Sequence, residues 1–262
     1  MLNIFDFYKM KQQQQKICMV TCYDYTSACL LSQTSIDCIL VGDSVAMTMH
    51  GFNDTLAATL EMMVMHTAAV SRGAQNKFII SDLPFLTYRK SLSKSITAAQ
   101  KLIQAGASAI KLEGAMGNTK LIRHLTESGV PVMGHLGLTP QLKHGLGGLK
   151  AQGRNDAEAD KIYEWAMELQ SAGCFAIVLE CIPSALAQKI TESLSIPTIG
   201  IGAGPSTDGQ VLVFQDLLGL QITLKPKFLK KFVEGFQYLS NGIEYYIKEV
   251  KNGEYPRDEH CY

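Results

Sequence analysis

The chain has 262 residues, with 47% hydrophobic and 18% charged side chains, and its 24 basic and 24 acidic residues give a net charge of zero. This composition excludes an intrinsically disordered chain, because such chains are poor in apolar residues and carry a high net charge. The balanced charge argues against binding to nucleic acid or to an anionic membrane surface. The length allows two average domains or one large α/β barrel.

The sequence shows no signal for export or membrane insertion. Residues 1–16 lack the apolar core of a signal peptide, and no apolar run approaches the roughly 18 residues of a membrane span. Seven cysteines are scattered without a C-x-x-C pair, and most lie in apolar runs, such as Cys18, Cys38 and Cys174. We therefore expect a soluble, cytoplasmic protein with no membrane partner and with buried, reduced thiols.

Apolar, β-rich runs alternate with helical segments along the chain. Strands are predicted over 17–21, 39–44, 78–81, 109–112, 130–137, 174–180, 196–204 and within 211–219. Helices are predicted near the N-terminus, over 22–33, 59–72, 91–106 and 121–125, from 155 or 156, from 183, and in the tail after 225. The helix over 91–106 places Leu92, Ile96, Ala99 and Ile103 on one face. Long irregular loops are predicted over 46–58 and 138–155, and such loops often carry function.

The strand pattern defines the expected fold. None of the eight runs shows the strict alternation of a half-exposed sheet, which is typical of buried parallel strands. Eight such strands favour a closed (β/α)8 barrel, with an N-terminal helix over one end of the core and a C-terminal helical tail. No linker divides the chain, so we expect a single domain over 1–262. A doubly wound open sheet is the alternative.

Polar side chains directly follow these apolar runs. In a (β/α)8 barrel the C-terminal ends of the strands meet at one mouth, which carries the active site. The residues that follow the runs, and that we therefore expect at this mouth, are Asp24, Asp43, Ser44, Asp82, Lys111, Glu113, His135 and Glu180.

Three of these carboxylates predict a metal site. Asp43, Asp82 and Glu113 offer oxygen ligands of the kind that Mg²⁺ prefers, and Lys111 could bind a carboxylate or oxo group of a substrate. Lys111 and Glu113 are two apart on a strand and face the same way, so a buried ion pair is the alternative. The dispersed histidines and cysteines do not fit a zinc site.

Two further strand-end residues suggest proton chemistry and substrate binding. A carboxylate such as Glu180 at an apolar barrel mouth would have a raised pKa and suit proton abstraction, unless it is an ordinary surface residue before a turn. His135 is either a hydrogen-bond donor to the substrate or a core histidine. The glycine-rich run 199–204 does not match the dinucleotide-binding fingerprint and indicates close backbone approach.

With these residues assembled, the chain resembles the ketopantoate hydroxymethyltransferase family nearly end to end. The resemblance rests on the ordered motifs VTCYDYTSA, ILVGDSVAMTMHG, HTAAVSRG, SDLPF, GASAIKLEG, GVPVMGHLGLTPQ, AQGR, FAIVLECIP, IPTIGIGAGPSTDGQVLV and DLLG. It implies a Mg²⁺-binding (β/α)8 barrel in a homo-oligomer, typically a decamer. It also implies hydroxymethyl transfer from 5,10-methylenetetrahydrofolate to 3-methyl-2-oxobutanoate, through a Mg-stabilised enolate, to give 2-dehydropantoate in pantothenate and coenzyme A biosynthesis.

The resemblance also assigns roles to residues of this chain. Asp43, Asp82 and Glu113 match the metal ligands, and Glu180 matches the proton acceptor. The contacts to the oxo acid match Asp43, Ser44, Asp82 and Lys111.

The chain departs from the family pattern in two places. Leu86 stands where glycine is usual after DLPF, and the stretch GGLKAQGR has Leu149 and Ala151 where an aromatic residue and valine are common. These changes affect loop packing, not the metal or base positions.

Two rival functions remain open. A Mg-dependent enolate lyase or mutase of the phosphoenolpyruvate mutase and isocitrate lyase kind uses similar strand-end acids, but the K-K-C-G-H run of those lyases is absent here. A barrel that has lost catalysis and serves as a scaffold would have lost strand-end residues that are all present.

Overall fold

A closed barrel of parallel strands forms the centre of the structure, which is a computed structural model that describes residues 1–221 and 226–262. The strands follow one another around the barrel in chain order, and β1 closes it by pairing with β8. The predicted (β/α)8 barrel is confirmed, and the open-sheet alternative is wrong. The strands are β1 (Ile17–Thr21), β2 (Cys38–Val41), β3 (Phe78–Asp82), β4 (Ala109–Lys111), β5 (Val132–Gly137), β6 (Ala176–Glu180), β7 (Thr198–Ile201) and β8 (Gly209–Leu212).

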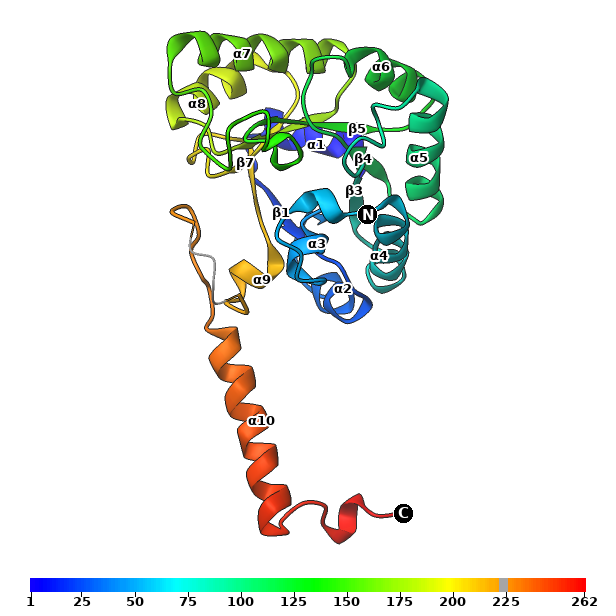
Figure 1. The fold of residues 1–262 in the computed structure, drawn as a ribbon, viewed down its shortest axis with the longest axis vertical. Helices are drawn as coiled ribbons and strands as arrows, with labels where there is room; N and C mark the ends of the chain where they lie inside the picture. The colour runs from blue at the N-terminus through cyan, green and yellow to red at the C-terminus, as the bar shows by residue number, and fades with distance from the viewer. Residues whose placement is uncertain (222–225) are drawn as a thin grey trace. The chain divides into compact units, whose positions relative to one another are not determined.

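Helices surround these strands, and α4 to α8 form an outer layer in Figure 1. The helices up to residue 212 are α1 (Ile4–Gln12), α2 (Tyr25–Ser32), α3 (Val45–Thr48), α4 (Leu60–Gly73), α5 (Leu92–Gln104), α6 (Thr119–Glu127), α7 (Asp156–Ser171) and α8 (Ser184–Ser193), with 3₁₀ turns η1 (Thr55–Ala57) and η2 (Pro140–Leu142). Side-chain caps define several starts: Thr59, Ser91 and Asn155 accept backbone N–H groups of the first turns of α4, α5 and α7. The segments 46–58 and 138–155, predicted as irregular, contain most of α3 and all of η1 and η2.

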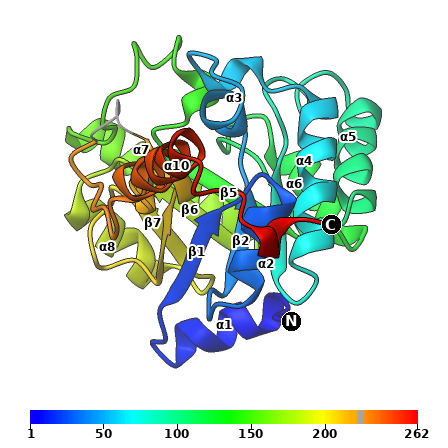
Figure 2. The same cartoon turned by 90° about the horizontal axis from the view of Figure 1, so that it is seen from below.

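The N-terminal helix α1 lies at the N-terminal ends of the strands (Figure 2), as the sequence predicted. Phe7 of α1 is fully buried, and its ring meets those of Phe78 and Phe175 at centroid distances of 5.1 and 5.5 Å. These rings join the apolar interior of the barrel in one core cluster. This end of the barrel is therefore closed by packing.

The barrel interior changes from apolar to polar along the strands. Side chains two apart on a strand point to the same face. The core cluster includes Ile80 on β3, Ala109 on β4, Met133 on β5 and Val178 on β6. Two residues further along these strands lie Asp82, Lys111, His135 and Glu180, respectively. The inward-facing series therefore becomes polar at the C-terminal ends, where a barrel carries its active site.

The chain divides into two compact units, residues 1–212 and 213–262. The first contains the whole barrel. The second contains α9 (Phe214–Leu217), α10 (Gly235–Asn252) and η3 (Asp258–His260), so the predicted helical tail is confirmed. The single domain expected over 1–262 stays a prediction.

Within the described ranges, no helix has the length and apolar content to cross a membrane. The seven cysteines are free. The prediction of buried thiols is confirmed for Cys22, Cys38 and Cys174 but is wrong for Cys18 and Cys261, which are exposed.

Leu86, which stands where glycine is usual in the family, has an unfavourable backbone conformation. Leu86 has a φ of 59°, in the left-handed region where a Cβ atom costs about 1–2 kcal/mol and glycine costs little. Its side chain is 47% exposed, so burial offsets little of that cost. This conformation explains why glycine suits the position.

We expect Leu86→Gly to raise the free energy of unfolding by up to about 1 kcal/mol, because relief of the left-handed strain exceeds the added entropy of a glycine in the unfolded chain. Urea unfolding measures the change. Leu149→Gly is the matched control, since Leu149 is also exposed and does not have a positive φ. If both substitutions destabilise the protein equally, the claim that the backbone of Leu86 is strained is contradicted.

Candidate active site

An ion pair between neighbouring strands forms the centre of the predicted site. Asp82 on β3 and Lys111 on β4 are partners in the strand register, and Lys111 Nζ lies 2.7 Å from Asp82 Oδ1. Both side chains are buried. Burial lowers the pKa of Lys111, but the carboxylates of Asp82, Asp43 and Glu113 outweigh it and raise that pKa above its ordinary value. Lys111 is therefore an ammonium ion inside the barrel.

Asp43 joins this pair from the turn after β2. Its backbone N–H donates to Asp82 Oδ2 at 3.1 Å, and its own side chain is buried. Gly42 before it leaves space for its neighbours, because a Cβ atom there would lie 2.9 Å from Ser44 Oγ and 3.6 Å from Asp82 Oδ2. Ser44 Oγ shares a hydrogen bond of 2.7 Å with the Tyr23 hydroxyl. The ILVGDS run thus brings a carboxylate and a hydroxyl to the barrel mouth.

Gln141, which the sequence analysis missed, connects two of the predicted metal ligands. Its backbone N–H donates to Glu113 Oε2 at 3.0 Å, and its Nε2 donates to Asp43 Oδ2 at 2.7 Å. Its side-chain oxygen accepts a hydrogen bond of 2.7 Å from the Tyr88 hydroxyl. Gln141 lies in η2, inside the segment predicted as an irregular loop. Its place in the GVPVMGHLGLTPQ motif was a signal that could have identified it.

His135 lies between two carboxylates. Its Nδ1 is 3.4 Å from Glu113 Oε1, and its Nε2 is 3.2 Å from Glu180 Oε2. Burial and the Lys111 ammonium lower the pKa of His135, but Glu113 and Glu180 outweigh them and raise it to about 9. The two carboxylates therefore favour the protonated ring, and His135 lies within the cluster of charged side chains; its role as a hydrogen-bond donor to the substrate stays a prediction.

Glu180 is the most accessible of the inward-facing acids. Its side chain is 19% exposed, against 3% for Asp82 and 1% for Glu113. Cys181, which follows it, has a φ of 49°, a strained conformation held by backbone hydrogen bonds to Ile201 and Gln152. Glu180 thus occupies a fixed position where a ligand in the mouth could reach it.

The predicted metal ligands do not form a finished coordination shell. Among the residues that the structure describes, no three His, Cys, Asp or Glu side chains are grouped so that they could hold a metal ion. The carboxylates of Asp82, Asp43 and Glu113 instead contact Lys111 and Gln141. The grouping of these residues as Mg²⁺ ligands stays a prediction.

The donor set nevertheless fits a hard cation by its chemistry. Burial raises the pKa of Asp43 well above its ordinary value, and the charges of Asp82 and Glu113 raise it further. Asp82 Oδ1 accepts no hydrogen bond from the described residues, although Lys111 Nζ lies 2.7 Å away as its ion-pair partner. Buried carboxylate oxygens that repel one another are the ligands to which Mg²⁺ binds.

Two sequence-derived candidates have other roles. Asp24 caps α2 by accepting the backbone N–H of Ser27 at 2.8 Å, so its position is explained by helix capping. In the glycine run, a Cβ atom at Gly200 would lie 2.6 Å from Thr207 Oγ1. Close backbone approach at this run is therefore confirmed.

The pKa of His135 predicts a pH dependence of stability. An unfolded histidine titrates near pH 6.5. Because the folded value is about 9, protonation favours the fold. This stabilisation is complete below about pH 6.5 and is lost as the pH rises through about 9, a change on the order of 3 kcal/mol. We therefore compare the free energies of unfolding of the wild type and of His135→Gln. The advantage of the wild type should shrink steadily as the pH rises over this range.

Urea unfolding across that pH range tests the expectation. His124→Gln, an exposed substitution on α6, serves as the control and should show a constant difference from the wild type. A constant difference for His135→Gln as well would show that the ring is not held as an imidazolium.

The fold and these contacts define a class: (β/α)8 barrel proteins with acidic, lysine and histidine side chains gathered at the carboxyl ends of the strands. Residues 1–258 match the family described as ketopantoate hydroxymethyltransferase. The chain belongs to this family, and it is an enzyme.

Two curated relatives support the same assignment. A 3-methyl-2-oxobutanoate hydroxymethyltransferase of Coxiella burnetii (strain Dugway 5J108-111) is 57% identical over 263 residues, which cover 100% of this chain and 99% of the relative. A protein of the same name from Bdellovibrio bacteriovorus is 54% identical over 262 residues, covering 100% of both chains.

A solved structure shows how widely the fold is shared. The phosphoenolpyruvate phosphomutase from Streptomyces platensis subsp. rosaceus superposes with a TM-score of 0.65 at 10% identity, covering 96% of this chain and 88% of that chain. At this identity the likeness shows the fold alone.

Proposed function

We propose that this protein transfers a hydroxymethyl group from 5,10-methylenetetrahydrofolate to 3-methyl-2-oxobutanoate and so forms 2-dehydropantoate for pantothenate and coenzyme A biosynthesis. The observation that carries the proposal is the paired arrangement at the mouth: the accessible Glu180 beside the buried His135, and the Asp82–Lys111 pair in the same barrel. The names of the relatives agree with this reaction.

Asp43, Asp82 and Glu113 would hold Mg²⁺. A bound Mg²⁺ supplies a Lewis acid that stabilises negative charge on the 2-oxo oxygen of the substrate. The protein's own part is to keep three carboxylates buried and connected: Lys111 contacts Asp82, and Gln141 donates hydrogen bonds to Asp43 and Glu113.

Glu180 removes the proton from C3 of the oxo acid. Its Oε2 faces the His135 imidazolium, which orients the carboxylate and leaves Oε1 to accept the proton. The carbanion equivalent at C3 then forms a C–C bond with the one-carbon unit of the folate. The bonds from that carbon to N5 and N10 break, water supplies the hydroxyl group, and tetrahydrofolate leaves with the protons that its two nitrogens require.

Lys111, Ser44 and His135 bind the oxo acid. The Lys111 ammonium lies where it can pair with the substrate carboxylate or with the developing charge on the 2-oxo oxygen. The Ser44 hydroxyl, oriented by Tyr23, and the protonated His135 offer hydrogen-bond donors at the same mouth.

We also propose that the protein is cytoplasmic and assembles as a homo-oligomer, typically a decamer in this family. Support for assembly comes from α10, where Leu239, Ile243 and Tyr246 are exposed at helical spacing on one stripe. Exposed apolar surfaces of this kind mark interaction sites.

The proposal is tested by incubating the purified protein with 3-methyl-2-oxobutanoate, 5,10-methylenetetrahydrofolate and Mg²⁺ and detecting 2-dehydropantoate by mass spectrometry. Product should require the protein and all three additions. Product formation that persists without Mg²⁺ in chelator-treated samples would contradict the metal assignment, and no product in the complete mixture would contradict the function.

A further inference from the structure

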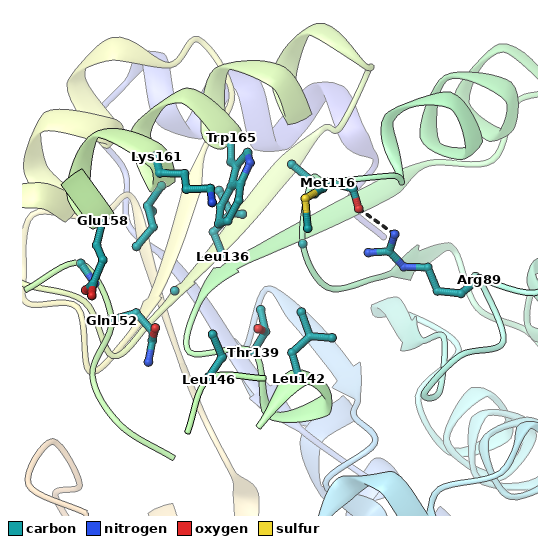
Figure 3. A pocket seen from close by; sticks show the side chains of 15 residues that line it. Arg89, Met116, Leu136, Thr139, Leu142, Leu146, Gln152, Glu158, Lys161 and Trp165 are labelled. Carbon is teal, nitrogen blue, oxygen red and sulfur yellow. Dashed lines mark hydrogen bonds between the residues drawn. The ribbon is translucent and has the colours of Figure 1, made fainter. Parts of the chain in front are cut away.

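A cavity of about 230 Å³ lies beyond β5, between α7 and the segment that follows the strand (Figure 3). Trp165 and Lys161 of α7 line one side, Leu142 and Leu146 line the other, and Met116 and Arg89 lie at a third. All of these residues belong to the barrel unit. The cavity therefore has an aromatic and aliphatic wall with two cationic side chains at its edge.

Backbone groups in and beside the wall of the cavity contact the backbone of Glu180, the proposed base, and of Cys181, which follows it. Gly137, which lines it, pairs with Glu180 in the register of β5 and β6, and Leu138 N–H donates to the Glu180 carbonyl at 2.8 Å. Gln152, on the opposite rim, donates its N–H to the carbonyl of Cys181 at 3.0 Å. A ligand in the cavity would thus lie against the backbone neighbours of Glu180, at the end of β5 that carries the mouth of the barrel.

The two cations of the cavity have no acidic partner in the described part of the chain. The Lys161 ammonium lies 5.1 Å from the centre of the Trp165 ring, and Arg89 donates to the carbonyl of Met116 at 2.7 Å. The acid that lines the cavity, Glu158, instead accepts the backbone N–H groups of Gly153 and Arg154. The charge of Lys161 and Arg89 therefore remains available to an anionic ligand.

We propose that this cavity binds the aminobenzoyl-glutamate arm of the folate co-substrate, which places the methylene carbon of the folate beside Glu180. The inference rests on the proposed function. The volume is below the roughly 300–1,000 Å³ of a whole ligand pocket, so it suits one ring and not an entire folate. The benzoyl ring packs against Trp165 and Leu142, and the glutamate carboxylates pair with Lys161 and Arg89.

Trp165 provides a direct readout because it is the single tryptophan of the chain. Titration with p-aminobenzoyl-glutamate should change the tryptophan fluorescence of the wild type. Lys161→Met and Arg89→Met should each weaken this binding, and each should raise the KM for 5,10-methylenetetrahydrofolate by about 10-fold. Neither should change deuterium exchange at C3 of 3-methyl-2-oxobutanoate, which needs no folate.

Lys189→Met is the matched control, because Lys189 is an exposed lysine of α8 that also lies over an aromatic ring, that of Tyr163. The control should keep the wild-type KM. If Lys161→Met and Arg89→Met also keep it while product is formed, the folate arm binds elsewhere and the inference is overturned. Failure of the proposed function would show in the wild type as an absence of product, whereas failure of this inference shows only in the variants.

Discussion

Glu180→Gln should slow deuterium exchange at C3 of 3-methyl-2-oxobutanoate by about 100-fold or more, because an amide cannot accept the proton. Glutamine keeps the size of the side chain, and the contact with His135 Nε2, now 3.2 Å from Glu180 Oε2, can persist through the amide oxygen. The loss should therefore fall on proton transfer and not on folding. Proton exchange followed by NMR, with Mg²⁺ and without folate, isolates this step.

The control for this experiment is Glu192→Gln, an exposed substitution on α8 whose partner is Gln188. It should exchange at the wild-type rate. Thermal unfolding of both variants checks that the fold is intact. An exchange rate for Glu180→Gln within a few-fold of the wild type would remove Glu180 from the role of base.

Lys111→Met should lower the free energy of unfolding by about 3–5 kcal/mol in the absence of metal, since it leaves buried carboxylates without their cation. Asp82 loses a contact of 2.7 Å, and the repulsion that already raises the pKa of Asp43 grows. Methionine keeps much of the packing of the lysine stem. Urea unfolding in the presence of a chelator measures the loss.

Adding Mg²⁺ should restore more stability to Lys111→Met than it adds to the wild type, because one cation then replaces another among the same carboxylates. Lys11→Met is the control: Lys11 also forms a partly buried ion pair, with Asp208 at 2.7 Å. Its loss of stability should not respond to Mg²⁺ beyond the wild-type gain. If Mg²⁺ gives Lys111→Met no additional stability, the cluster does not hold the metal.

The sequence was sufficient to predict the barrel and the polar side chains at the carboxyl ends of β3, β4, β5 and β6, for a reason visible along these strands. The inward series is apolar until its last members, as in Ile80 followed by Asp82 on β3 and Met133 followed by His135 on β5. A strand buried on both faces and ending in an ionisable group is a local pattern, so it can be read without knowledge of tertiary contacts.

The strand-end pattern did not reveal the roles of two other residues, Gln141 and Asp24. Gln141 acts through Asp43, which lies 98 residues away along the chain, and no local pattern predicts that bridge. Asp24 also follows an apolar run, but its carboxylate caps α2 through Ser27, a local role that the strand-end pattern does not reveal.

The buried face of α5 consists mostly of other residues than those predicted. Leu92 is exposed, and the buried residues of this helix are Ser95, Ala98, Ala99 and Leu102. Small residues that allow close packing took the place of larger apolar ones, which a hydrophobicity pattern does not capture.

The most direct test of the central claim, that the acids at the barrel mouth hold the cation beside which the oxo acid loses its proton, is a crystal structure with Mn²⁺ in place of Mg²⁺ and with 3-methyl-2-oxobutanoate. Anomalous scattering locates the Mn²⁺ without bias. We predict one metal peak within coordination distance of Asp43, Asp82 and Glu113, with C3 of the substrate facing the Glu180 carboxylate. A metal peak elsewhere in the barrel, or a bound substrate whose C3 faces away from Glu180, would contradict this account.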